Sequence, residues 1–222
     1  AYAISLGLVG SEMCIRDSSS SATSSGLFVV VGDSGTILTS SDGTTWTSRT
    51  SGTSNGLYNI FYGNSTFVAV GHSGTILTSS DGTTWTSRTS GTSEHLYGIT
   101  YGNSTFVVAG DNDSGSVGTI LTSSDGITWT SRTSGTTNDL WDVNYGNNTF
   151  VASDSTGGIR TSSDGINWTS RTSGTSETLK GVVYGNSTFV AVGYWGTILT
   201  SSDGITRTTG TFGIYNKYKA DV

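Results

Sequence analysis

The sequence predicts an all-β protein, a β-propeller of about five four-stranded blades. Three observations predict this fold: a unit of ~39 residues recurs five times, each unit holds four short stretches with strand character, and glycine-bearing turns separate these stretches. Gly accounts for 32 of the 222 residues and Pro is absent. Aromatic residues reach 10% while charged residues are only 12%, which favours a folded chain over a disordered one.

The repeat is marked by the tetrapeptide Ser-Ser-Asp-Gly. Its aspartates lie 39, 44, 39 and 39 residues apart, at Asp42, Asp81, Asp125, Asp164 and Asp203. A tryptophan follows four residues after each of the first four aspartates, at Trp46, Trp85, Trp129 and Trp168, whereas the fifth copy has Arg207. The one longer spacing comes from an insertion within residues 110–118.

The second unit shows the expected strands in order. Residues 57–62 form the first strand and end at a Gly-Asn-Ser turn; residues 66–70 are apolar on both faces and form a central strand. Residues 74–79 form the third strand, closed by an Asp-Gly turn in which Gly takes a positive φ, and residues 84–89 form the fourth. A β-solenoid is the alternative, but its rungs would repeat at about half this period, and no such sub-repeat is visible.

The two ends of the chain differ from the repeats. We expect a leader over residues 1–23, propeller repeats over 24–209 and a tail over 210–222. The first unit lacks the first strand of the other four, so the chain holds four blades and three quarters of another. The tail is a candidate for the missing inner strand, although Lys217 and Lys219 fit poorly there; otherwise the chain is an open fragment of a larger ring.

The repeated residues resemble those of two groups of known propellers. Residues 40–46, Ser-Ser-Asp-Gly-Thr-Thr-Trp, resemble the Asp-box of sialidase-type (BNR) propellers, although they are one residue shorter between Asp and Trp. The whole unit is similar to the repeats of bacterial propellers related to the photosystem II stability and assembly factor. This resemblance implies a structural role for the motif, in which the Asp accepts hydrogen bonds within the turn and the Trp packs between blades.

The leader has a different resemblance. Residues 8–17 resemble a translated sequencing-adapter tract, and nothing in them matches the repeat. A natural leader is the alternative, although the basic region of a signal peptide is missing. The sole cysteine, Cys14, lies in this tract, so the cysteine count gives no information about the redox compartment.

Several functions are disfavoured by composition and motifs. A formal net charge of -6 with 10 Lys and Arg argues against a nucleic-acid partner, and no apolar run is long enough for a membrane span. His72 and His95 specify neither a catalytic triad nor a metal site, and Asp111–Gly115 only begins a calcium-loop pattern. The repeated arginines fall at one equivalent position on the outer strand, which predicts a peripheral, structural role. We therefore expect no cofactor, no metal and no enzymatic activity.

Variation between the repeats predicts a binding face. The turns after the first and third strands hardly vary, whereas the loops before the first strand and after the second strand do. In an up-and-down blade these variable loops share one face with the start of the inner strand. The predicted ligand-binding residues are Tyr58, Tyr97, Trp141, Lys180, Glu94, His95, Asn138, Asp139, Tyr194 and Trp195, and they are expected to lie opposite the five Asp-Gly turns.

Aromatic rings beside amides and carboxylates suit sugars, so the first functional prediction is a non-enzymatic module, extracellular or on a bacterial cell surface, that binds carbohydrate or another extracellular polymer. The alternative is a protein-assembly or adhesion scaffold. A degenerate sialidase-type hydrolase is the weakest of the three.

Overall fold

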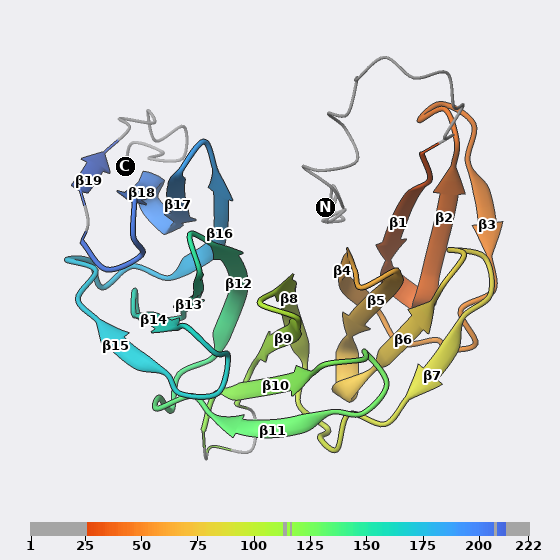
Figure 1. Cartoon of the computed structure of the whole chain (residues 1–222), viewed down its shortest axis with the longest axis horizontal. Helices are drawn as coiled ribbons and strands as arrows, with labels where there is room; N and C mark the ends of the chain where they lie inside the picture. Colours follow the sequence, from red (N-terminus) through yellow and green to blue (C-terminus); the bar gives the residue numbers. More distant parts are fainter. Residues whose placement is uncertain (1–25, 113–114, 116, 207, 212–222) are drawn as a thin grey trace, which may run out of the picture.

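The computed structural model describes residues 26–112, 115, 117–206 and, for the backbone, 208–211. Within these residues five antiparallel sheets are arranged around a common centre as an open arc (Figure 1). This confirms the predicted all-β fold and the architecture of an incomplete propeller. The leader and most of the tail lie outside the described residues, so the expectations about them stay predictions.

Each sheet is a meander whose strands follow one another from the centre of the arc outward. The first sheet has three strands, β1 (Phe28–Gly32), β2 (Thr36–Ser40) and β3 (Thr47–Arg49). The second has β4 (Leu57–Gly63), β5 (Thr66–Gly71), β6 (Ile76–Ser79) and β7 (Thr86–Arg88). The third has β8 (Leu96–Gly102), β9 (Thr105–Gly110), β10 (Thr119–Ser123) and β11 (Thr130–Thr133).

The last two sheets repeat the same order. The fourth consists of β12 (Leu140–Gly146), β13 (Thr149–Asp154), β14 (Ile159–Ser162) and β15 (Thr169–Arg171). The fifth consists of β16 (Leu179–Gly185), β17 (Thr188–Gly193), β18 (Thr197–Ser201) and β19 (Thr208–Thr211). Among the described residues no helix has the length and apolar character needed to cross a membrane.

Two strands of the second unit are shorter than the sequence predicts. Gly74 belongs to a 3-10 turn, η2 (His72–Gly74), in which Ser73 has a φ of 51° that a strand does not allow. The fourth strand begins at Thr86 because the preceding backbone N–H groups of Thr83 and Thr84 both donate to the Asp81 carboxylate, each at 2.8 Å. In both places the residues next to the strand adopt a turn conformation, which shortens the strand.

The core is divided into four apolar clusters, each lying between two neighbouring blades. In one of them Val68 and Val70 of β5 pack with Ile99 of β8 and Phe106 of β9, and all four are buried. Trp85, Trp129 and Trp168 pack against successive clusters. Blades therefore stabilise one another across their faces, and each single blade has too little buried surface to fold alone.

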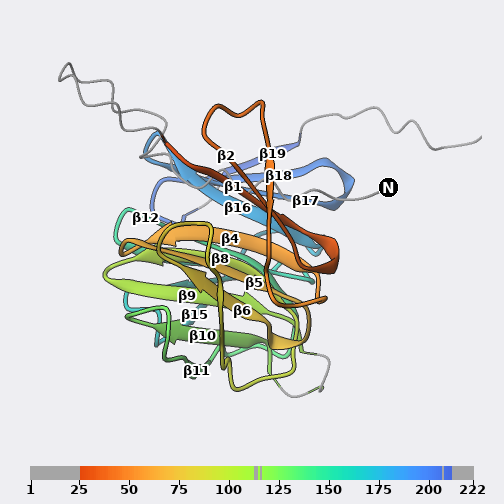
Figure 2. The ribbon, with the colours of Figure 1, turned by 90° about the vertical axis from the view of Figure 1, so that its right-hand side faces the viewer.

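The strand ends gather at two opposite sides of the molecule, seen at the left and right of Figure 2. Pairing of β4 with β5 puts Gly63 opposite Thr66 at one end and Leu57 opposite Gly71 at the other. The first of these, the Asp-turn end, carries the Asn-Ser or Asn-Asn turns after the inner strands and the five Asp-Gly turns. The second, the variable-loop end, carries the loops that differ between repeats.

Candidate functional site

The variable-loop end contains one irregularity that recurs in all four complete blades. The register between the first and second strands shifts after the first residue of the inner strand, at Leu57, Leu96, Leu140 and Leu179. The residue after each leucine is therefore a β-bulge, and a bulge turns its side chain out of the regular alternation. The four bulge residues are Tyr58, Tyr97, Trp141 and Lys180.

These bulge residues stack on one another from blade to blade. The ring centroids of Tyr58 and Tyr97 are 5.4 Å apart with an interplanar angle of 29°, and those of Tyr97 and Trp141 are 4.5 Å apart at 24°. The Lys180 Nζ lies 2.8 Å from the centroid of the Trp141 ring and 5.3 Å from that of Tyr194. We call Tyr58, Tyr97, Trp141 and Lys180 the bulge ladder.

The ladder leaves little aromatic surface free in its middle. Tyr97 and the Lys180 ammonium both lie over the Trp141 indole, so they must cover its two faces. Burial lowers the pKa of Lys180, and the negative charge of Asp139 opposes that shift. Trp195 is different, because 76% of it is exposed. A sugar ring would find an open indole at Trp195 but not at Trp141.

Hydrogen bonds between neighbouring loops hold the first part of the ladder. The buried Asp111 carboxylate accepts the backbone N–H of His95 at 2.7 Å and the hydroxyl of Tyr97 at 3.2 Å. His95 in turn accepts the backbone N–H of Ser73 on its Nδ1 at 3.0 Å, and its ring lies 4.1 Å from that of His72. The loops of two blades are thus connected through His95, a position where the other complete blades have Gly56, Asp139 and Thr178.

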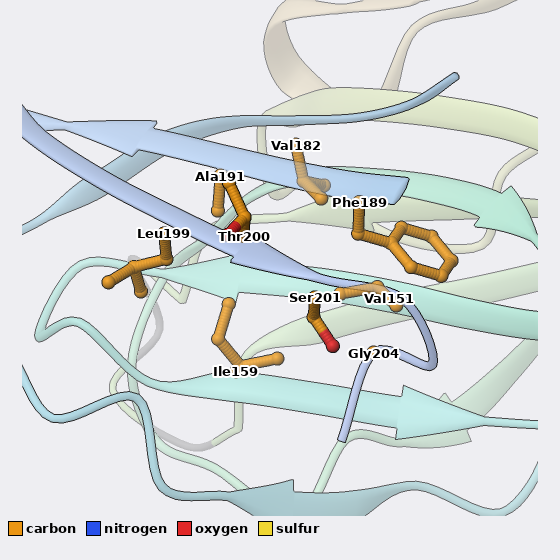
Figure 3. A pocket seen from close by; sticks show the side chains of 9 residues that line it. All are labelled: Val151, Ile159, Val182, Phe189, Ala191, Leu199, Thr200, Ser201 and Gly204. Atoms are coloured by element: carbon orange, nitrogen blue, oxygen red, sulfur yellow. The ribbon is translucent and has the colours of Figure 1, made fainter. Parts of the chain in front are cut away.

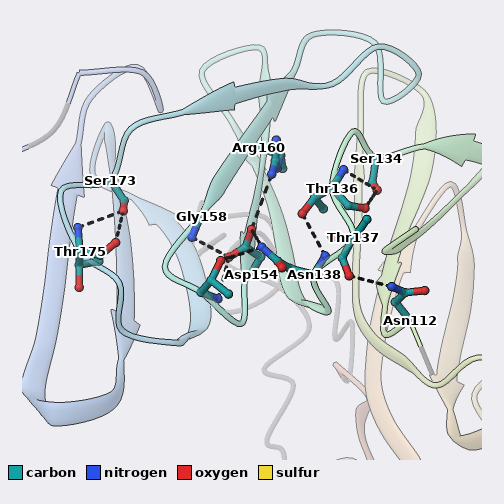
Figure 4. Close-up of polar contacts among 11 residues, drawn as sticks. Asn112, Ser134, Thr136, Thr137, Asn138, Asp154, Gly158, Arg160, Ser173 and Thr175 are labelled. Atoms are coloured by element: carbon teal, nitrogen blue, oxygen red, sulfur yellow. Dashed lines mark hydrogen bonds and ion pairs between the residues drawn. The ribbon is translucent and has the colours of Figure 1, made fainter. Parts of the chain in front are cut away.

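The fourth blade carries a buried polar network shown in Figure 4. Asp154 is fully buried and accepts the backbone N–H groups of Thr156 at 2.9 Å and Gly158 at 2.6 Å. Its second oxygen accepts the Asn138 amide at 3.3 Å and lies 3.9 Å from Nη2 of Arg160. The equivalent positions in the other blades are glycines: Gly32, Gly71, Gly110 and Gly193.

A second carboxyl with little access to solvent, that of the half-buried Asp142, was not predicted from the sequence. Asp142 on β12 accepts the backbone N–H of Val143 at 2.8 Å and that of Val182, on β16, at 2.9 Å. Burial raises its pKa to about 7, although both hydrogen bonds oppose the shift. Its only sequence signal is an acidic residue inside an inner strand, where the other blades have Asn59, Gly98 and Gly181.

All ten predicted binding residues fall at the variable-loop end. The ladder residues and Tyr194 are in contact, His95 lies 6.2 Å from Tyr97 between ring centroids, and Asn138 is engaged with Asp154. Glu94 and Asp139 lie in the loops that lead into β8 and β12, and Trp195 extends from the 3-10 turn η3 (Tyr194–Gly196). Their role in binding a ligand stays a prediction.

The Asp-turn end contains hydrogen bonds that recur from blade to blade. In each Asp-Gly turn the aspartate accepts two backbone N–H groups and one serine hydroxyl, and these bonds hold its pKa below the ordinary value. The same set recurs at Asp81, Asp125, Asp164 and Asp203. Trp85, Trp129 and Trp168 donate their indole N–H to the carbonyl of the turn glycine.

Three other features are candidates for a site: the repeated arginines, the 111–115 loop and a cavity between two blades. The repeated arginines donate through Nε to threonines of the neighbouring strand, from Arg49, Arg88, Arg132 and Arg171. Among the described residues no group of three His, Cys, Asp or Glu side chains is placed to hold a metal, and the 111–115 loop is only partly described. The cavity between the fourth and fifth blades, shown in Figure 3, measures about 10 Å³, which is too small for a ligand.

Comparison with known proteins supports the fold. No protein-family model and no curated protein sequence matches the chain. Among solved structures, the one described as YCF48 bound to D1 peptide has a TM-score of 0.60 and 18% identity, covering 82% of this chain and 62% of its own. YCF48 from Cyanidioschyzon merolae has a TM-score of 0.60 and 15% identity, covering 83% and 69%.

A designed protein is also similar. The computationally designed Ika8 protein has a TM-score of 0.64 and 15% identity, covering 85% of this chain and 58% of its own. The chain thus spans between 58% and 69% of the length of these proteins. At such identities the likeness shows the β-propeller fold alone. The Asp-box classification and the adapter origin of residues 8–17 stay predictions.

Proposed function

We propose that this chain is a non-enzymatic scaffold that binds a polypeptide segment at its variable-loop end. The observation that supports this most directly is the bulge ladder, which places two tyrosines, a tryptophan and a lysine at the same position of four blades and joins them into one continuous surface. A repeated frame with a diversified surface is the arrangement that propellers and other repeat proteins use for recognition. The YCF48 neighbour, bound to a D1 peptide, supports a peptide as the ligand class.

The experiment is selection of peptides from a displayed random library on the immobilised chain, followed by affinity measurement with the chain in solution. We expect selected peptides to lose at least fivefold in affinity in Trp195→Ser, because serine occupies this position in the first two repeats and preserves the turn. Trp46→Ser is the matched control, since Trp46 follows an Asp-turn and is also exposed, at 38%. Failure to select any peptide, or a fall in affinity in Trp46→Ser as large as the fall in Trp195→Ser, contradicts the proposal.

A carbohydrate ligand is the second candidate, and the open indole of Trp195 favours it. A glycan array separates the two. Binding of glycans that is lost in Trp195→Ser, without peptide selection, would replace the polypeptide by a sugar at the same end of the molecule.

A further inference from the structure

An exposed aromatic arm extends from the fifth blade. Tyr194 and Trp195 lie at the first two positions of η3 and are 53% and 76% exposed. Trp195 has a φ of 57°, a left-handed conformation that is unfavourable for a bulky side chain. At the equivalent position the first two blades have Ser34 and Ser73 with φ values of 56° and 51°. A large ring in a strained and exposed position contributes nothing to the core, which points to contact with a ligand.

The side of the arm that faces the ladder already binds a cation. The Lys180 ammonium lies over the Trp141 ring at 2.8 Å from its centroid and 5.3 Å from the Tyr194 centroid. A cation over an aromatic face is attracted by the negative charge of the π system. The chain therefore shows in its own structure which kind of group these rings accept, while the Trp195 ring next to them remains exposed.

The charge around the arm is also suited to a cation. Four carboxylates with solvent access lie in the loops of this end, at Asp33, Glu94, Asp139 and Glu177. Among the described Lys and Arg residues, Lys180 lies on an inner strand of this end, and Arg160 is beside the buried Asp154. The repeated arginines also lie toward this end, but on the outer strands, where each donates to a threonine: Arg49, Arg88, Arg132 and Arg171. The inner loops therefore carry more negative than positive charge, which attracts a basic segment and repels an acidic one.

We propose that the polypeptide bound at the variable-loop end is basic, and that a Lys or Arg side chain of it packs on the Tyr194–Trp195 arm. This inference rests on the proposed function, because it names the chemistry of the partner for the same surface. The arm supplies the aromatic faces, and the loop carboxylates supply the long-range attraction. The Lys180–Trp141–Tyr194 contact is the internal counterpart of the contact that the ligand makes.

The test uses the sequences of the peptides selected on the full chain. We expect Lys and Arg to be enriched relative to the input library and Asp and Glu to be depleted. Affinity of a selected peptide should fall at least tenfold in the double variant Asp139→Lys, Glu177→Lys, and it should fall steeply with added salt. Thermal unfolding of this variant, followed by circular dichroism, controls for folding.

Other outcomes would contradict the inference, the role of the arm or the proposed function. Selected peptides with no charge bias, or with an acidic bias, overturn the inference and leave the proposed function standing. A basic bias that persists while Trp195→Ser binds as tightly as the unaltered chain overturns the role of the arm. If no peptide is selected at all, the proposed function itself fails.

Discussion

The two ends of the strands connect neighbouring blades in different ways. At the Asp-turn end the connection is the same each time: the amides of Asn64, Asn103 and Asn147 donate to the carbonyls of Ser124, Ser163 and Ser202 in the next blade, at 3.4, 3.3 and 3.2 Å. At the variable-loop end the bulge ladder runs through four blades, the His72–His95 pair occurs only between the second and third blades, and the bond from Val182 to Asp142 occurs only between the fourth and fifth. The Asp-turn end is therefore a uniform frame, whereas the side chains of the variable-loop end differ from blade to blade and form the recognition surface.

The difference shows why one end suits a scaffold and the other a recognition surface. The Asp-turns use backbone donors, which do not depend on the side chains of the next blade. The ladder uses side chains throughout, so each change there alters the surface while the strand pairing below is kept. Predictions that compare the two ends can separate these roles.

The largest expected effect is on stability, at a tryptophan of the Asp-turn end. Trp129→Ala should lower the free energy of unfolding by about 2 to 4 kcal/mol, because the partly buried Trp129 packs against a core cluster and donates its indole N–H to Gly126. Trp46→Ala should cost less than about 1 kcal/mol, since Trp46 is 38% exposed. Urea unfolding measures both. Equal losses in the two variants would contradict the packing of Trp129, and not of Trp46, in a space between blades.

The next expected effect is the pH dependence of the free energy of unfolding, which has opposite signs for the carboxyl groups at the two ends. The pKa of Asp142 is raised from 3.8 to about 7, so its stabilising contribution is present below pH 4 and is lost as the pH rises through about 7. The loss should be on the order of 2 to 4 kcal/mol and should disappear in Asp142→Asn. The Asp-turn carboxylates have lowered pKa values, so their contribution is present above pH 4 and is lost in acid.

Unfolding by urea between pH 3 and pH 8 checks this account. Stability should be greatest near pH 4 to 5 and decrease toward pH 8 in the unaltered chain only. If Asp142→Asn shows the same decrease toward pH 8, Asp142 is not the group responsible.

The smallest effect is a gain. Trp195→Asn should raise the free energy of unfolding by about 0.5 to 1 kcal/mol, because Asn tolerates the left-handed φ of 57° better than Trp and the exposed indole has little packing to lose. Thermal unfolding measures the shift. A loss of stability would show that Trp195 has a structural role and would weaken the account of the arm.

The sequence alone predicts the frame well, because its signals are local. Asp81, Gly82 and Trp85 recur at fixed spacing, and the turn they form depends mainly on neighbouring residues. The end at which Tyr58 and Tyr97 lie follows in the same way from the alternation of strands and turns.

Contacts between blades could not be predicted in this way. The sequence shows that Trp141 is aromatic and that Lys180 occupies the equivalent position, but only the structure shows that Lys180 covers Trp141. Asp142 was missed for the same reason, since its partner Val182 belongs to the next blade. The network of Asp154 was also missed, although its partner Asn138 belongs to the same blade. The sugar platform expected at Trp141 is therefore not supported, while Trp195 remains open.

Hydrogen–deuterium exchange of the full chain, with and without a selected peptide, tests directly whether the variable-loop end is the recognition surface. We expect the peptide to slow exchange in the loops and strand starts of the variable-loop end, over residues 93–98, 137–142, 177–182 and 193–197. Exchange in the Asp-turns, over residues 80–84, 124–128 and 163–167, should stay unchanged. Protection confined to the Asp-turns, or spread equally over both ends, would contradict the separation of a frame from a recognition surface.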